Sequence, residues 1–207
     1  MNATDRKRIW QRAEKGHAAE QNQLGLMHLA GDGVEPSVEQ AAHWFRLAAG
    51  QGLREAQFNL GELLRTGIGV AVDYNHARHY FELAARQHLA DAEFALGQMH
   101  EFGQGVPPDA EKAAQYYRLA AESGHAKAQY FLGGLCVEGN GVPRDMVEAY
   151  FWFSLAADQE EPNGADCREM IEHRMTQSQI TKAKRRLEDH YSREPSFFED
   201  AGDDSNV

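Results

Sequence analysis

The chain has 207 residues, of which 42% are hydrophobic and 26% charged, and its formal net charge at pH 7 is −11. Such an acidic chain disfavours non-specific contact with nucleic acid or an anionic membrane, so we expect neither as a partner. No segment has the roughly 20 consecutive apolar residues of a membrane-spanning helix. The first ten residues are polar and do not fit a secretory signal, and a count of two cysteines fits a reducing compartment. We therefore expect a cytoplasmic protein.

Residues 1–17 predict a single helix at the N-terminal end of the molecule. Ala13 and Gly16 occupy the positions that Ala49 and Gly52 hold 36 residues later, where a second helix of a pair is expected to end. A helix without its own partner fits the end of a repeat array, because terminal units cap the stack. We expect this segment to be an N-terminal capping helix.

A 36-residue unit then recurs four times without insertion, over residues 18–53, 54–89, 90–125 and 126–161. Each copy contains a Leu-Gly pair, a Gly-x-Gly-Val turn and an Ala-Ala pair at the same spacing. The Leu-Gly pairs begin at Leu24, Leu60, Leu96 and Leu132. Such a fixed period predicts a solenoid, in which each short unit is stable only when stacked on its neighbours.

The third unit shows how each copy is expected to fold. Ala92, Leu96 and Met99 have helical spacing, and the helix they define is expected to end near Gly103. Asp109 is suited to cap a second helix, because its carboxylate accepts free amide hydrogens of the first turn. Each unit is therefore predicted to be an antiparallel helix pair, which makes the chain all-α.

A glycine follows the leucine in every first helix, although glycine inside a helix costs about 1 kcal/mol relative to alanine. The second helix of each unit carries two adjacent aromatic residues. These pairs are Trp44-Phe45, Tyr80-Phe81, Tyr116-Tyr117 and Trp152-Phe153. We expect each glycine to form a socket for an aromatic side chain of the partner helix.

After Pro162 the repeat stops. Residues 162–192 predict a C-terminal pair of capping helices, in which Thr176 and Gln179 form a capping box. The basic run from Lys182 to Arg186 is expected to be a solvated face of the last helix, although contact with nucleic acid or an acidic partner is an alternative. Residues 193–207 are acidic and are expected to be a disordered tail.

The pattern Ala-x3-Leu-Gly-x5-Gly-x-Gly-Val-x2-Asp resembles the Sel1-like repeat, a relative of the tetratricopeptide repeat. Residues 92–124 match it nearly throughout, and the resemblance extends over residues 18–161. The segment around Thr176 and Gln179 also resembles the tail that follows such arrays in bacterial members. The resemblance implies a right-handed α/α superhelix that acts as an adaptor or scaffold through protein–protein contacts.

By analogy with tetratricopeptide repeats, the first helices are expected to line a concave face that binds a protein or peptide. Four positions relative to the leucine of each unit define this face. They place there Asn22, Phe58, Phe94, Tyr130, Glu55, Asp91, Lys127, Glu62, Gln98, Arg65 and Glu101. The predicted groove has an aromatic strip flanked by mostly acidic groups. An alternative is that the aromatic residues only pack between adjacent repeats.

The sequence predicts no catalytic residues, metal or cofactor. The ten histidines include no His-x-x-x-His spacing, and Cys136 has no neighbouring base and is expected to be buried. Two other functions stay open as alternatives. One is a hydrolase of the β-lactam-binding kind found in cysteine-rich relatives, whose cysteine pairs this chain lacks. The other is self-assembly, although we expect a monomer.

Overall fold

The computed structural model describes residues 2–193, which form eleven α-helices and no β-strand. In chain order the helices are α1 (Ala3–Glu14), α2 (Ala18–Ala30), α3 (Val38–Gly50), α4 (Arg54–Thr66), α5 (Tyr74–Ala85), α6 (Ala90–Phe102), α7 (Ala110–Glu122), α8 (Ala126–Glu138), α9 (Met146–Asp158), α10 (Gly164–Glu172) and α11 (Gln177–Tyr191). The predicted acidic tail, apart from its first residue, lies outside the described residues.

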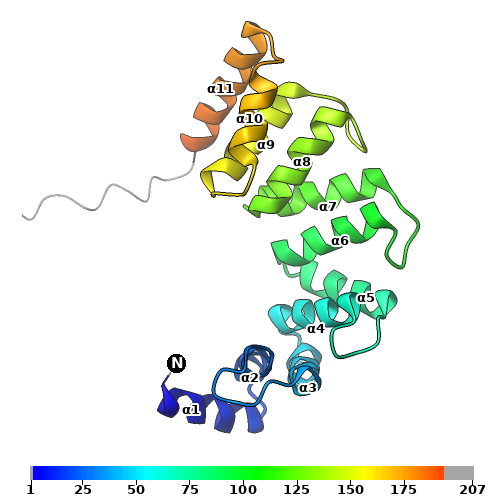
Figure 1. Cartoon of the computed structure of the whole chain (residues 1–207), viewed down its shortest axis with the longest axis vertical. Coiled ribbons are helices and arrows are strands. Elements are labelled where there is room, and N and C mark those ends of the chain that lie inside the picture. The colour runs from blue at the N-terminus through cyan, green and yellow to red at the C-terminus, as the bar shows by residue number, and fades with distance from the viewer. Residues whose placement is uncertain (1, 194–207) are drawn as a thin grey trace, which may run out of the picture.

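Helices α2 to α9 form four pairs, α2–α3, α4–α5, α6–α7 and α8–α9, each packed against the next. Figure 1 shows the pairs following one another along an arc whose two ends bend towards the same side. Helix α1 packs on α2 at one end, and α10 and α11 both pack on α9 at the other. The prediction of an all-α solenoid of helix pairs is confirmed.

The turn inside each pair begins at a glycine and ends at a capping side chain. Gly103 closes α6 with φ 68° and ψ 33°, a left-handed conformation that suits glycine, and its amide N–H donates to the Met99 carbonyl. Asp109 then caps α7, because its carboxylate accepts the Lys112 amide N–H at 3.0 Å. Ser37, Asp73 and Asp145 cap the second helices of the other pairs. Because the glycine that ends the first helix and the side chain that caps the second recur in every unit, the antiparallel helix pair recurs as well.

The glycine sockets are present in all four pairs. A Cβ atom added to Gly97 would lie 2.6 Å from the Tyr117 ring, far inside van der Waals contact, and the Tyr117 side chain is fully buried. The other three sockets hold the second aromatic residue of each pair in the same way, as Gly25 with Phe45, Gly61 with Phe81, and Gly133 with Phe153. The expectation that glycine admits an aromatic side chain of the partner helix is confirmed.

Buried glutamines link the units, a feature that the sequence analysis did not use. Gln57 donates from Nε2 to the Ala49 carbonyl of the preceding unit at 3.4 Å and accepts from Gln87 at 2.9 Å. Gln21 and Gln129 make equivalent bonds, to Ala13 and Gln51 and to Ala121 and Gln159. The third unit has Glu93 and Ser123 at these two positions instead. Atom Oε2 of Glu93 is buried and has no hydrogen-bond partner within residues 2–193.

A half-buried ion pair helps to hold the last helix on α9. Arg186 pairs with Glu148, and its guanidinium carbon lies 4.1 Å from the centre of the Phe151 ring. Trp152 also donates to Glu148, at 2.8 Å. The expectation that the basic run is only a solvated face is therefore wrong for Arg186, since its apolar stem and charge both meet α9.

Candidate functional site

The three aromatic residues predicted for the groove form a row along α4, α6 and α8. Each packs at a tilt against the aromatic side chain that fills the glycine socket of its own unit. The ring-centre distances are 5.8 Å for Phe58–Phe81, 5.4 Å for Phe94–Tyr117 and 5.7 Å for Tyr130–Phe153. Because each ring of the row packs against a buried ring of the core, the core fixes the orientation of these three side chains.

These aromatic side chains pack and also line open space. Phe58, Phe94 and Tyr130 are half-buried, and they border a groove of about 530 Å³ across α4, α6 and α8. Phe94 also lies 5.5 Å from Phe131 of the next unit. The alternative that these residues only pack between repeats is therefore incomplete, since each of the three rings also faces the groove.

Eight of the eleven residues predicted for the concave face line this one groove. They are Phe58, Glu62, Arg65, Asp91, Phe94, Gln98, Lys127 and Tyr130. The hollow that they share with residues 161–163 is called the α4–α6–α8 groove below. The first helices of three successive units line this groove, so it is a feature of the array and not of a single unit.

The other three predicted residues lie outside the groove. Asn22 of α2 accepts a hydrogen bond from Asn59 at 2.9 Å, which ties the first two units together. Glu55 forms an ion pair with Arg54 at 3.0 Å. Glu101 accepts from the Tyr117 hydroxyl at 2.5 Å and borders a second, neighbouring hollow.

Charges in the α4–α6–α8 groove are largely paired within the chain. Arg65 donates to both carboxylate oxygens of Glu62, at 2.9 and 2.8 Å, and this bonding raises the pKa of Arg65. Asp91 lies 3.5 Å from Nε2 of His125. Lys127 is exposed at the edge. Glu161 is a further acidic residue of the lining, so the wall is aromatic with three acidic and two basic side chains.

His125 is a groove residue that the sequence analysis did not select. Its ring stacks on Phe94 at 4.7 Å, and its Nδ1 atom accepts the Ala128 amide N–H at 3.0 Å, which caps α8. Burial lowers the pKa of His125, and the accepted bond requires an unprotonated Nδ1. The neutral ring therefore carries its proton on Nε2, towards Asp91. A histidine immediately before α8 was a usable capping signal, although the other units hold His17, Leu53 and Leu89 at this position.

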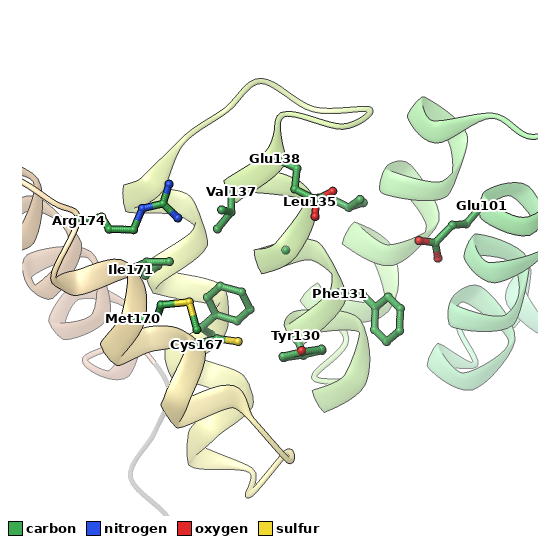
Figure 2. A pocket seen from close by; sticks show the side chains of 12 residues that line it. Glu101, Tyr130, Phe131, Leu135, Val137, Glu138, Cys167, Met170, Ile171 and Arg174 are labelled. Atoms are coloured by element: carbon green, nitrogen blue, oxygen red, sulfur yellow. The ribbon is translucent and has the colours of Figure 1, made fainter.

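A second hollow, of about 260 Å³, adjoins the groove and shares Tyr130 and Phe131 with it. Figure 2 shows Cys167, Met170 and Ile171 of α10 on one side of this hollow and the side chains of α8 on the other. Its walls are mostly apolar, with Glu101, Glu138 and Arg174 among the lining residues. We call it the α8–α10 pocket. No repeat column predicted it, because α10 lies outside the repeats.

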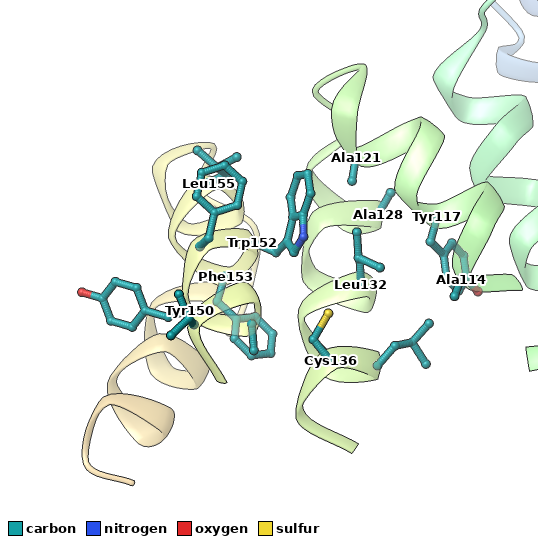
Figure 3. Packing of buried hydrophobic residues seen from close by; sticks show 14 of the residues in the cluster. Ala114, Tyr117, Ala121, Ala128, Leu132, Cys136, Tyr150, Trp152, Phe153 and Leu155 are labelled. Carbon is teal, nitrogen blue, oxygen red and sulfur yellow. The ribbon is translucent and has the colours of Figure 1, made fainter. Parts of the chain in front are cut away.

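Features of catalytic chemistry are few in the described part of the chain. No group of three or more histidine, cysteine or acidic side chains is placed to hold a metal ion within residues 2–193. Figure 3 shows Cys136 in the core near Leu132 and Phe153, and burial raises the pKa of its thiol to about 11. Its thiol is therefore protonated near neutral pH. Across the same residues, every helix is too short or too polar to cross a membrane.

The fold defines an α-solenoid of stacked helix pairs, with a groove across three of its first helices. A family model described as the Sel1 repeat matches residues 21–53, 54–89, 90–125 and 126–161. The chain therefore belongs to the Sel1 repeat family, whose members are generally scaffolds for protein–protein interaction. No curated protein matches the chain.

Two solved structures extend this comparison. A Sel1 repeat protein from Oxalobacter formigenes is 33% identical, with a TM-score of 0.71 over 79% of this chain and 47% of its own. A protective antigen present in uropathogenic Escherichia coli strains, which displays an SLR fold, is 27% identical, with a TM-score of 0.59 over 90% of this chain and 48% of its own. This chain thus spans about half the length of both structures.

Proposed function

We propose that this protein is an interaction scaffold that holds a segment of a partner protein in the α4–α6–α8 groove. The observation that carries the proposal is one groove lined by eight of the eleven residues that the analogy with tetratricopeptide repeats selects. Half-buried aromatic rings next to charged groups are typical of interface hot spots, since they offer apolar area at a fixed orientation. A groove built by successive units suits an extended or helical segment.

A pull-down with one blocked groove variant tests this proposal. Gln98 lies in the middle of the groove, so Gln98→Trp fills it. Gln115→Trp makes the same change on the exposed surface of α7, outside the groove. Both variants are compared with wild type in lysate of the native cells, after circular dichroism shows equal helix content and thermal midpoint.

We expect one partner that wild type and Gln115→Trp retain and that Gln98→Trp loses at least tenfold. Equal capture by all three proteins would contradict the groove as the binding face. Light scattering on the wild type checks that the protein is a monomer, as we expect, because a dimer would point to self-assembly instead.

A further inference from the structure

The α8–α10 pocket exists because the repeat departs from its own pattern at Gly134. Two residues after the leucine of the Leu-Gly pair, the first three units have Leu26, Glu62 and Gln98, and only the fourth unit has glycine. A Cβ atom on Gly134 would meet nothing within 4 Å, whereas Gly133 must leave room for Phe153. Packing therefore does not require the glycine at 134, although glycine is less favourable than alanine inside a helix. What the glycine provides is space.

The pocket has the size and lining for one large apolar side chain. Its volume of about 260 Å³ exceeds the roughly 150 Å³ of a cavity that admits benzene. Met170, on the α10 wall, is 59% exposed, Ile171 lies beside it on α10, and Val137 of α8 lines the same space. An apolar side chain entering here would cover surface that the described chain leaves in water, which is favourable at about 25 cal/mol per Å².

Charges around the pocket indicate which side chains flank that anchor. The carboxylates of Glu101 and Glu138 border the pocket, and Glu101 is half-buried beside Tyr117. Arg174 is the basic residue at its α10 side. The whole chain carries a net charge of −11, which attracts basic segments over longer distances. A lysine or arginine on the α6 side of the anchor therefore complements this surface.

We propose that the α8–α10 pocket receives one large apolar side chain, Leu, Met or Phe, of a basic protein segment whose remaining residues lie in the α4–α6–α8 groove. Tyr130 and Phe131 line both hollows, so one continuous segment passes from one to the other. This inference rests on the proposed function and adds the anchor and the charge of the partner.

The test uses the full chain and a phage-displayed library of random 12-residue peptides, selected on wild-type protein. Selected peptides are synthesised, and their affinities are measured by fluorescence anisotropy for wild type, Gly134→Leu and Gly50→Leu. Gly134→Leu fills the pocket on a helical backbone with open space around it. Gly50→Leu adds the same side chain on α3, also without a clash, and controls for added apolar surface.

Labelling of Cys167 by iodoacetamide gives an independent readout of pocket occupancy. Cys167 lines the pocket and is partly accessible, whereas Cys136 is buried and has a raised pKa, so Cys136 serves as the unreactive internal control. Mass spectrometry of the intact protein counts the alkyl groups added with and without the selected peptide. A peptide seated in the pocket is expected to slow labelling at Cys167 at least fivefold.

The proposal expects peptides with one large apolar residue near a Lys or Arg, bound at least tenfold more weakly by Gly134→Leu and unchanged by Gly50→Leu. Peptides that bind wild type and Gly134→Leu equally, but lose affinity for Gln98→Trp, would overturn the anchor while leaving the groove proposal standing. Selected peptides that leave Cys167 labelling unchanged would also overturn the anchor. Failure to enrich any peptide would count against both proposals.

Discussion

At the scale of single residues, Glu93 stands where the other three units have a buried glutamine, and we expect this difference to lower the stability of the fold. Gln21, Gln57 and Gln129 each donate an amide hydrogen to a carbonyl eight residues earlier. Ala85 supplies the corresponding carbonyl for Glu93, and an ionised carboxylate has no hydrogen to donate to it. Burial raises the pKa of Glu93, nearby Glu122 adds to this rise, and His88 opposes it.

Glu93→Gln is therefore expected to stabilise the protein. The amide restores the donor that three other units have and replaces a buried carboxylate whose Oε2 atom has no hydrogen-bond partner within residues 2–193. A gain of about 1 kcal/mol is expected at pH 7, which corresponds to a rise of about 2–4 °C in the thermal midpoint. Calorimetry measures this shift. The reciprocal control, Gln57→Glu, places the same carboxylate in the second unit and should lower the midpoint; a stabilising effect of that change would contradict the explanation.

The stability difference between Glu93→Gln and wild type is expected to depend on pH. The folded pKa of Glu93 lies above the ordinary value near 4.5, so the folded state binds the proton more tightly than the unfolded state. The destabilisation by Glu93 is complete above its folded pKa and disappears below its unfolded pKa. Urea titrations at pH 7 and pH 4 should therefore show a smaller difference at pH 4. A constant difference would mean that ionisation of Glu93 is not the cause.

Replacement by alanine should have opposite effects on the unfolding free energy at Gly97 and at Gly134, two glycines of first helices. Gly97→Ala pushes a methyl group into the Tyr117 ring and is expected to cost about 1–3 kcal/mol of unfolding free energy. Gly134→Ala meets open space and is expected to gain up to about 1 kcal/mol from helix propensity. Urea denaturation of both variants measures the difference. Equal effects at the two positions would contradict the socket account.

At the scale of elements, Arg186 makes several of the contacts that hold the last helix on α9, beside those of His190 and Tyr191. Arg186 neutralises Glu148 and covers Phe151, both on α9. The side-chain hydrogen bond and the positive charge of Arg186 lower the pKa of Glu148, although burial acts in the opposite direction as the largest single effect. Helix α11 itself contains one fully buried side chain, Ala183. Arg186 therefore contributes much of what fixes α11 on α9.

Arg186→Ala is expected to destabilise the protein by about 1–2 kcal/mol, because it uncovers the Phe151 ring and leaves a half-buried carboxylate with fewer partners. Arg185→Ala is the matched control, since Arg185 is exposed on the same helix. Hydrogen exchange should show faster exchange in α11 of the first variant alone. Unchanged protection of α11 would indicate that other contacts hold the helix.

At the scale of the whole molecule, the sequence predicts the repeated parts of the fold well, because repetition multiplies each signal. Gly103 and Asp109 mark a turn once, and their equivalents mark it three more times. The glycine sockets followed from the same logic, since four glycines opposite four aromatic residues have one common physical cause. The contacts of Arg186 occur once and give no such signal, so the sequence does not separate Arg186 from the exposed residues of the basic run.

The candidate site likewise has a part that the repeats predict and a part that they do not. Repeat columns placed Phe58, Phe94 and Tyr130 in a common row, and the groove follows them. The pairing of Glu62 with Arg65 is a contact within one helix that the repeat columns do not specify. The α8–α10 pocket needs α10, whose position relative to α8 no periodicity specifies. Gly134 was the available signal, as a glycine in a column that otherwise holds larger residues.

The most direct test of the central claim is site-specific photo-cross-linking in the native cells. A benzophenone amino acid replaces Gln98 in the groove or, as control, Gln115 on α7, and mass spectrometry identifies the cross-linked protein and its attached segment. The account predicts a discrete product from position 98, joined through a segment that carries an apolar residue next to a basic one, and none from position 115. The same partner cross-linked from position 115 but not from position 98 would contradict the claim that the groove binds.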